Sequence, residues 1–125
     1  MASAEDEAKV REAHNRYFQA LGSGDMDALA ESFTFPAAFK GFLEDVVIAP
    51  DKGSLIATYE KLIAAAPKAT RTEVHSLDVS YVRPGVYSLT MSYEQFGADD
   101  APIHEGRAVY FLKSVNDDFK LFAVF

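Results

Sequence analysis

The sequence contains no cysteine and no tryptophan. Without cysteine, the chain forms no disulfide, no thiolate metal site and no cysteine nucleophile. The three histidines show no H-x-x-x-H or comparable pair, so we expect neither a metal site nor another cofactor. A phosphate-binding glycine loop and a G-x-S-x-G elbow are also missing, so nothing supports phosphoryl transfer or serine hydrolysis.

Long apolar runs and clusters of positive charge are scarce as well. No apolar stretch approaches the roughly 20 residues of a membrane-spanning helix, and the acidic start MASAEDEAKV lacks the apolar centre of a signal peptide. We therefore expect a cytoplasmic protein with no membrane partner. The twelve Lys and Arg residues are spread along the chain rather than clustered, and the nineteen Asp and Glu residues outnumber them, which gives a net charge of −7. No nucleic-acid partner is therefore expected.

The chain does contain enough apolar material for one hydrophobic core. Of its 125 residues, 49% are hydrophobic, including ten phenylalanines and six tyrosines. A chain of this length buries about two-thirds of its unfolded surface. No repeat, linker or low-complexity segment interrupts it. We predict a single domain over residues 1–125.

Apolar residues recur every three or four positions from Ala4 to Leu21, which predicts an amphipathic helix. Ser3 and Asp6 have the spacing of a capping box at its start. Gly22 and Gly24 are expected to end it, because glycine adopts the left-handed conformation without a steric penalty.

A second, shorter helix is predicted to begin after Asp25, which can accept hydrogen bonds from its first amides, and to extend to Phe33. Pro36 is expected to mark the exit from that helix. Strand formers around a polar turn then predict a short hairpin within residues 37–49. A third helix is expected to start at Asp51 or Ser54 and to end by Pro67.

After Pro67 the apolar pattern changes to a period of two, which predicts strands. The stretches EVHSLDVSYV and VYSLTMSYEQF are expected to form a hairpin around Arg83-Pro84-Gly85. Two further strands are predicted over 107–113 and 119–125. Both are apolar on their two faces, and one layer of helices covers only one face of a sheet. The sequence therefore predicts a homodimer formed through the sheet's other face.

The order of elements and two short motifs resemble a known superfamily. The helix carrying Tyr17 leads into the turn Gly24-Asp25-Met26-Asp27-Ala28-Leu29, and the predicted strand contains LTMSYEQFG at 89–97. In these features the chain resembles the ketosteroid isomerase and SnoaL-like branch of the nuclear transport factor two-like superfamily. The resemblance implies an α+β fold, the cystatin-like cone, with N-terminal helices packed on a curved mixed, mostly antiparallel sheet.

The resemblance also implies candidate catalytic residues. Ketosteroid isomerases move a proton with a carboxylate base while a tyrosine and a protonated aspartic acid hold the enolate oxygen. The tyrosine corresponds to Tyr17. Depending on where a gap is placed, the base position falls on Glu44 or Gly41, and the second donor position on His104 or Ala108. The last two share strand parity, so both side chains are expected on one face.

Two classes of function remain open from the sequence. The first is a domain that binds a small, apolar, carbonyl-containing molecule and either carries it or moves a proton on it as an isomerase or lyase, with His104 or Glu44 as base. The second is a non-catalytic dimerisation or protein-interaction module that uses the sheet face, with Tyr17 packed in a filled core. For the first class, the expected pocket wall consists of Tyr17, Phe18, Phe33, Phe35, Tyr59, Leu89, Met91, Tyr93 and Tyr110.

Overall fold

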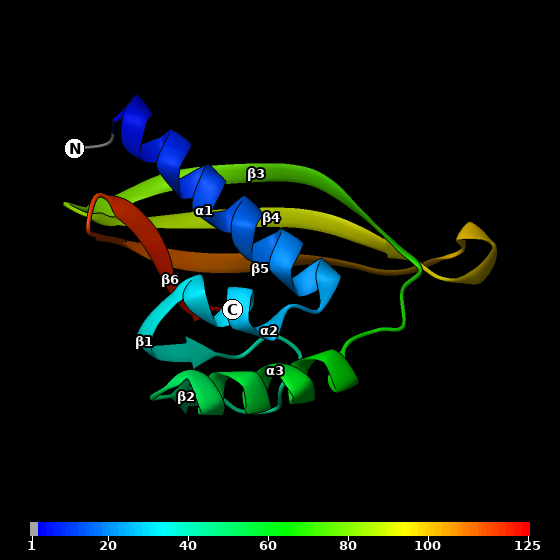
Figure 1. Cartoon of the computed structure of the whole chain (residues 1–125). Coiled ribbons are helices and arrows are strands. Elements are labelled where there is room, and N and C mark those ends of the chain that lie inside the picture. The colour runs from blue at the N-terminus through cyan, green and yellow to red at the C-terminus, as the bar shows by residue number, and fades with distance from the viewer. Residues whose placement is uncertain (1–2) are drawn as a thin grey trace.

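Three helices pack on one face of a six-stranded sheet in the computed structural model, which describes residues 3–125 (Figure 1). The helices are α1 (Ala4–Ser23), α2 (Met26–Glu31) and α3 (Lys52–Ala65), with a short 3₁₀ helix η1 (Ala98–Asp100). The strands are β1 (Phe33–Phe39), β2 (Val47–Ala49), β3 (Arg71–Arg83), β4 (Val86–Phe96), β5 (Pro102–Val115) and β6 (Asp118–Val124). The predicted α+β class is confirmed. The single-domain prediction over 1–125 stays a prediction, and residues 1 and 2 lie outside the described part.

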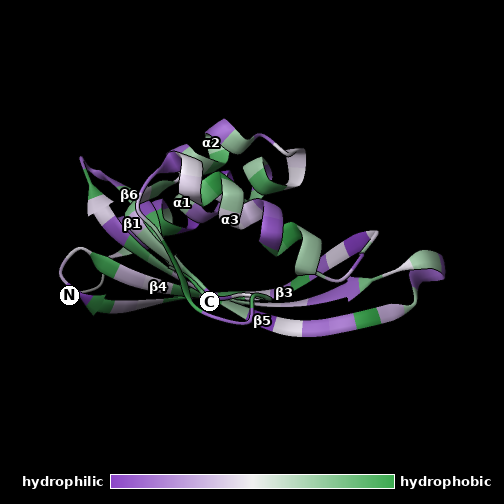
Figure 2. Ribbon diagram, turned by 90° about the horizontal axis from the view of Figure 1, so that it is seen from below, coloured by the Kyte–Doolittle hydropathy of each residue, from purple (hydrophilic) through white to green (hydrophobic). Residues whose placement is uncertain are grey.

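The sheet is mixed and mostly antiparallel, as predicted. Its strand order is β2-β1-β6-β5-β4-β3, and only the β1–β6 pair is parallel among the pairs of the described chain. In Figure 1, α1 crosses over β3, β4 and β5, while α3 lies beside β1 and β2. Figure 2 shows the same helices together on one side of the sheet. The helices and the inner face of the sheet therefore enclose the space between them.

The predicted helix caps account for how the helices begin and end. The Ser3 side chain accepts a hydrogen bond from the Asp6 amide at 3.0 Å, and Gly24 ends α1 with a φ of 73°. Asp25 caps α2 through the Ala28 amide at 3.1 Å. Of the two candidate starts for the third helix, the structure uses Asp51, which accepts from the Ser54 amide at 2.9 Å.

The prediction that the second helix extends to Phe33 and exits at Pro36 is wrong. The helix ends at Glu31, and Phe33 opens strand β1, where it pairs in parallel with Leu121 of β6. Phenylalanine and threonine favour strands, and pairing with β6 satisfies their backbone groups. Pro36 lies where the β1–β6 register shifts, so its missing amide hydrogen costs no regular ladder bond.

The long strands extend further than the sequence pattern predicts. β5 begins at Pro102 rather than Arg107, and β3 begins at Arg71 rather than Glu73. Both extra segments pair with β4, which provides partners as far as Phe96. The sheet therefore projects beyond the helices on the side of η1. The predicted hairpin within 37–49 also forms, with three residue pairs between β1 and the short strand β2.

Side chains on the inner face of β3, β4 and β5 form successive cross-strand rows. The rows, taken from the β3–β4 turn toward η1, are Tyr81–Tyr87–Leu112, Val79–Leu89–Tyr110, Leu77–Met91–Ala108, Val74–Tyr93–Gly106 and Thr72–Gln95–His104. The first rows are apolar and the last is polar, in agreement with the hydrophilic ends of β3 and β5 near η1 in Figure 2. The inner face therefore changes from core to a polar edge along the strands.

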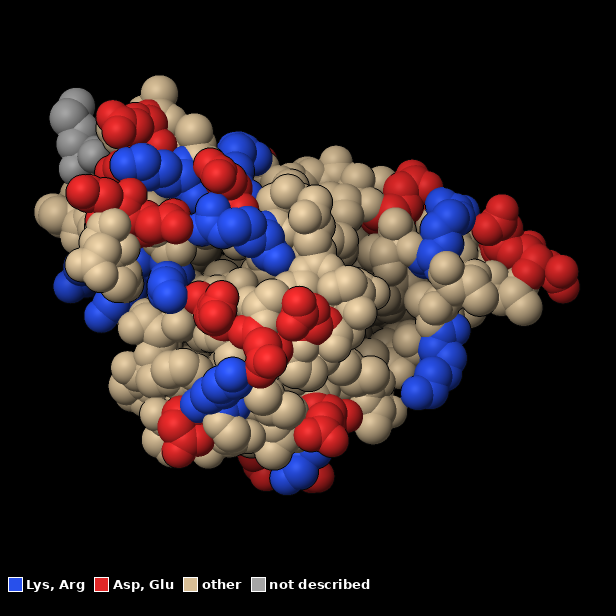
Figure 3. Space-filling view, viewed as in Figure 1, with Lys and Arg blue, Asp and Glu red and all other residues tan. Residues whose placement is uncertain are grey.

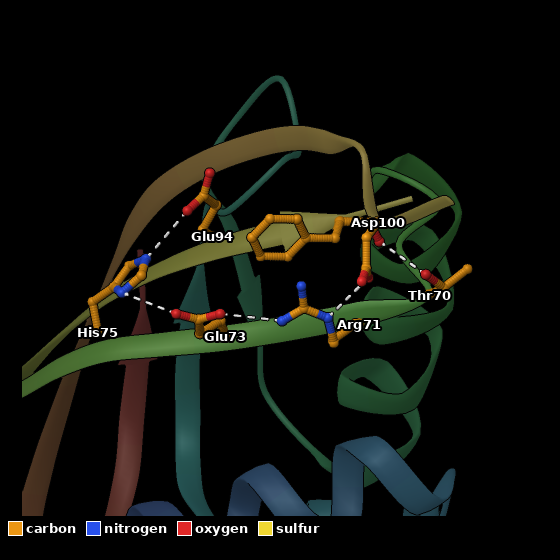
Figure 4. A network of polar contacts seen from close by, with 7 residues as sticks. Thr70, Arg71, Glu73, His75, Glu94 and Asp100 are labelled. Atoms are coloured by element: carbon orange, nitrogen blue, oxygen red, sulfur yellow. Dashed lines mark hydrogen bonds and ion pairs between the residues drawn. The ribbon is translucent and has the colours of Figure 1, made fainter. Parts of the chain in front are cut away.

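The outer face near η1 carries a network of charged side chains (Figure 4). Arg71 contacts Glu73 at 3.1 Å and Asp100 at 3.2 Å, and its guanidinium lies 4.0 Å from the centre of the Phe96 ring. His75 lies between Glu73 and Glu94. Exposed ion pairs are worth about 0–1 kcal/mol each, so the network orients η1 more than it stabilises the fold.

Charge elsewhere follows the solvent-facing surfaces. On the face shown in Figure 3, acidic and basic side chains are mixed over the N-terminal half of α1, and acidic ones project at η1. Among residues 3–125, no helix is both long enough and apolar enough to cross a membrane.

Candidate functional site

The helices and the inner face of the sheet enclose a cavity of about 530 Å³. Pockets for small molecules occupy about 300–1,000 Å³ and have mostly apolar walls with a few polar groups. Phe42, Ile63 and Phe125 are each more than 40% exposed and mark its mouth. The remaining lining residues are Tyr17, Phe18, Leu21, Gly22, Gly41, Tyr59, Leu62, Ala66, Thr72, Met91, Tyr93, Gln95, His104, Gly106, Arg107, Ala108, Tyr110 and Val124.

Three tyrosines from different elements meet at the buried part of this cavity. The Tyr17 hydroxyl of α1 and the Tyr59 hydroxyl of α3 are 2.8 Å apart and form a hydrogen bond. Tyr110 of β5 packs edge-on against Tyr17, with ring centres 5.5 Å apart. All three residues are at most 4% exposed. The sequence periodicity placed Tyr17 on the inward face of its helix, and the fold supplies it with phenolic neighbours.

The hydroxyl pair can act as a hydrogen-bond donor to a bound molecule. Burial raises the pKa of Tyr17 well above its ordinary value, and burial likewise raises the pKa values of Tyr59 and Tyr110. The phenols therefore keep their protons at neutral pH. The bond between Tyr17 and Tyr59 uses one of the pair's two hydroxyl protons, and the other can go to the neighbouring Tyr110 hydroxyl or to an acceptor in the cavity.

A second polar group lies toward the open end of the cavity. The Tyr93 hydroxyl is 3.2 Å from Nε2 of His104. Burial raises the pKa of Tyr93, so its hydroxyl keeps the proton, and the tautomer of His104 decides which of the two atoms donates. Gly106 lies beside this pair, and a Cβ there would be 2.7 Å from His104 Nε2 and 3.0 Å from the Tyr93 hydroxyl. The absence of a side chain at Gly106 is what lets the pair form.

Gln95 and Thr72 complete the polar edge, and sequence reasoning missed both. Gln95 Nε2 donates to Thr72 Oγ1 at 3.4 Å, while Gln95 Oε1 is buried without a hydrogen-bond partner within residues 3–125. The strand alternation that placed Tyr93 inward also places Gln95 inward. That signal was available, but a polar residue near a strand end is equally typical of solvent exposure.

The structure brings together most, not all, of the expected pocket wall. Tyr17, Phe18, Tyr59, Met91, Tyr93 and Tyr110 line the cavity. Phe33 packs behind the tyrosine pair, with ring centres 5.7 Å from Tyr17 and 6.0 Å from Tyr59. Phe35 contacts the core from β1, and Leu89 is fully buried in the row below Met91. These three residues lie outside the lining within the described chain.

The structure shows which of the candidate bases and candidate second donors line the cavity. Glu44 is exposed in the loop between β1 and β2 and does not line the cavity, whereas Gly41, its alternative, does so without a side chain. His104 and Ala108 both line the cavity, as their shared strand parity requires. Within residues 3–125 no Asp or Glu lines it. Among the described residues, the cavity wall therefore lacks a carboxylate base of the ketosteroid isomerase type.

His14 lies deeper, beside the cavity rather than on its wall. It is 3% exposed, its ring centre is 4.5 Å from that of Tyr110, and its Nε2 has no partner in the described structure. Burial lowers the pKa of His14 to about 4, so the ring is neutral at physiological pH. His14 therefore acts as a packing residue beneath the tyrosines.

Comparison with known proteins identifies the fold. No protein-family model matches the chain, and no curated protein sequence matches it either. A protein of unknown function with a cystatin-like fold from Nostoc punctiforme is similar, with a TM-score of 0.76 and 15% identity over 98% of this chain and 90% of that one. The Aln2 protein from a Streptomyces species gives a TM-score of 0.74 and 16% identity, with coverages of 99% and 91%.

A nuclear transport factor two-like protein of unknown function from Pseudomonas putida gives a TM-score of 0.79 and 13% identity over 99% of this chain and 87% of that one. The chain therefore has the cystatin-like α+β fold of nuclear transport factor two-like proteins. At these identities the likeness concerns the fold, and the function has to be argued from the cavity.

Proposed function

We propose that this domain binds an uncharged, largely apolar small molecule in the cavity and that the Tyr17–Tyr59 pair donates a hydrogen bond to a carbonyl oxygen of that molecule. The observation that carries the proposal is a buried hydroxyl pair, whose mutual bond uses one of its two protons, at an apolar cavity of about 530 Å³. The lack of lining carboxylates in residues 3–125 disfavours cationic ligands. A cavity of this size also argues against a core filled only by its own aromatic residues.

The test compares two probes of similar shape, 2-acetylnaphthalene, which has a carbonyl oxygen, and 2-ethylnaphthalene, which has none. Calorimetry measures their affinities for the wild type and for the double variant Tyr17→Phe/Tyr59→Phe. Removing both partners of a hydrogen bond is nearly neutral for folding, so the variant is expected to fold. The preference for the acetyl probe should fall about tenfold in the variant, as expected for one lost hydrogen bond.

Tyr81→Phe is the matched control, because Tyr81 lies in the row at the opposite end of the sheet and is not part of the cavity wall. Its variant should keep the wild-type preference. An equal preference in the wild type and the double variant would exclude the hydroxyl pair as the carbonyl's donor. Failure of the wild type to bind either probe would contradict the binding proposal as a whole.

Proton transfer next to a carbonyl is the second candidate function, and the presence of His104 on the same cavity wall favours it. In the tautomer whose Nε2–H donates to the Tyr93 hydroxyl, Nδ1 of His104 has a free lone pair, so His104 is the lining base that can remove a proton next to a carbonyl bound at the mouth of the cavity. The methyl hydrogens of 2-acetylnaphthalene provide a direct assay in D₂O. We expect the wild type to speed their exchange for deuterium and His104→Gln to abolish that acceleration. Exchange at the buffer rate would leave a binding protein without this chemistry.

A homodimer through the outer face of the sheet is the third element of the proposal. Phe111 of β5 lies near Phe122 of β6, with ring centres 6.1 Å apart, on the face that the helices leave uncovered. Phe111 pairs with Ser88 of β4, at the other end of that strand from Phe96, on which Arg71 of the charged network packs. An apolar patch on an otherwise charged surface favours association, and a second copy offers the same patch.

A further inference from the structure

We propose that Gln95 makes the cavity selective for ligands that carry a neutral hydrogen-bond donor, a hydroxyl or N–H group, at the mouth. The proposal rests on the binding function argued above and adds a second polar contact at the end opposite the tyrosine pair. It makes Gln95 a specificity-determining residue rather than part of any proton-transfer chemistry.

The unpartnered oxygen of Gln95 is the starting observation. Oε1 is buried and accepts no hydrogen bond from the described residues, although the amide's Nε2 donates to Thr72. A buried carbonyl oxygen without a partner costs free energy, and native proteins rarely leave one in that state. Because Gln95 lines the cavity, a bound molecule can supply the missing donor.

The neighbours of Gln95 do not supply that donor themselves. His104, its cross-strand partner on β5, is engaged through Nε2 by the Tyr93 hydroxyl. Thr72, its partner on β3, already accepts from Nε2. On the next row, Val74 and Gly106 have no polar side-chain group. Thr72 holds the amide through Nε2, which leaves Oε1 of this lining residue as the acceptor without a partner among the described residues.

The chemistry of the surroundings also defines the charge of the donor. Within residues 3–125, no Asp or Glu lines the cavity to balance an ammonium group. Arg107 also lines the cavity, but it directly follows Gly106 on β5. Because side chains alternate along a strand and Gly106 belongs to the inner face, the Arg107 side chain points to the outer face of the sheet. A neutral hydroxyl or amide N–H is therefore the group that Gln95 Oε1 selects.

The experiment uses 2-naphthol, which donates a hydrogen bond, and 2-methoxynaphthalene, which has the same ring system and oxygen but no donor. Calorimetry gives the affinity of each probe for the wild type and for Gln95→Leu, which keeps the side chain's bulk and removes the acceptor. We expect the preference for 2-naphthol to fall about tenfold in Gln95→Leu. Gln95→Glu, which keeps an oxygen acceptor at that position, should retain the preference.

Two controls separate this proposal from the binding proposal. Glu94→Gln changes the neighbouring residue on the outer face and should keep the 2-naphthol preference. Tyr81→Phe should keep it too, since Tyr81 is not part of the cavity wall. Binding of both probes with an unchanged preference in Gln95→Leu would overturn the role of Gln95 while leaving the cavity as a binding site. Failure of both probes to bind the wild type would overturn both proposals.

Discussion

Gly106 illustrates how one residue without a side chain determines the chemistry of the cavity mouth. It faces Tyr93 across the β4–β5 pair, and the Tyr93 ring folds over it so that the hydroxyl meets His104. Glycine in a strand usually weakens pairing, because it adds backbone entropy and no packing. Here the space it leaves holds a tyrosine–histidine hydrogen bond, which fixes the position of the cavity's histidine.

Gly106→Ala should therefore break this pair. The added Cβ comes too close to both polar atoms, so one ring must move, and we expect a loss of about 1–3 kcal/mol in the free energy of unfolding. Urea unfolding measures the loss, and the ¹⁵N shifts of the His104 ring report the broken hydrogen bond. Gly22→Ala in α1 is the control, because nothing lies within 4 Å of its Cβ. Identical ring shifts in Gly106→Ala and wild type would contradict the role given to Gly106.

His14 should make the fold sensitive to acid in a defined window. Its pKa is lowered to about 4 by burial, while the unfolded chain takes up the proton near the ordinary value of 6.5. Between these values the unfolded state binds more protons, so stability falls as the pH falls. The two pKa values correspond to a loss of about 3 kcal/mol.

Urea unfolding at several pH values between 7 and 4 measures this dependence. His14→Leu has no proton to bind, so its stability should decrease less than that of the wild type over the same window. Parallel curves for the two proteins would show that His14 is not buried in its neutral form.

Residue-level prediction from the sequence worked where one helix or strand determined the direction of a side chain. Tyr17 and Tyr93 lie on the faces that periodicity assigned to them, and His104 lies on the same face as Ala108, as their shared strand parity predicted. The hydrogen bond from Tyr17 to Tyr59 was out of reach, because it joins two helices whose separation depends on the packing of the whole domain. The base position was ambiguous for a related reason. The alignment of the loop that carries Glu44 was open in the sequence, and the course of that loop in the fold determines that Gly41, not Glu44, lines the cavity.

At the scale of elements, the Gly24–Asp25 turn sets how α1 lies over the sheet. Gly24 ends α1 in the left-handed conformation, and Asp25 at once caps α2, a helix of six residues. Such a short helix has little stability of its own, so its cap matters. The turn thereby directs the second half of α1, including Tyr17 and Phe18, toward the cavity.

Asp25→Ala should cost about 1 kcal/mol of stability, because the Ala28 amide loses its acceptor. Thermal and urea unfolding measure the change. Glu31→Ala, at the exposed end of the same helix, should stay within about 0.5 kcal/mol of the wild type. Equal effects of the two substitutions would show that the cap does not stabilise α2.

The elements that the sequence predicted poorly are those whose conformation depends on a distant partner. Residues 33–36 carry a helix-compatible pattern, but β6, more than 80 positions away in the chain, draws them into a parallel pair. The first residues of β5 alternate weakly and include glycine, yet β4 provides their hydrogen-bond partners. Local pattern decides an element when its own apolar face is strong, and long-range pairing decides it otherwise.

At the scale of the whole molecule, the helices and the inner face of the sheet enclose the cavity, and the outer face carries the aromatic patch formed by Phe111 and Phe122. We expect the wild type to be a dimer and Phe122→Glu to be a monomer, because a buried charge on each copy would oppose the contact. Size-exclusion chromatography with light scattering measures the mass. Ile48→Glu, which charges an exposed residue on the edge strand β2, should leave the dimer intact. A monomeric wild type would contradict this assembly.

The central claim is that the cavity holds a carbonyl compound through the Tyr17–Tyr59 pair, and a crystal structure of the protein with 2-acetylnaphthalene tests it most directly. The account predicts electron density for the probe inside the cavity, with its carbonyl oxygen about 2.5–3.0 Å from the hydroxyl of Tyr17 or Tyr59. A probe bound only on the outer face, or a cavity closed by its own side chains, would contradict the claim.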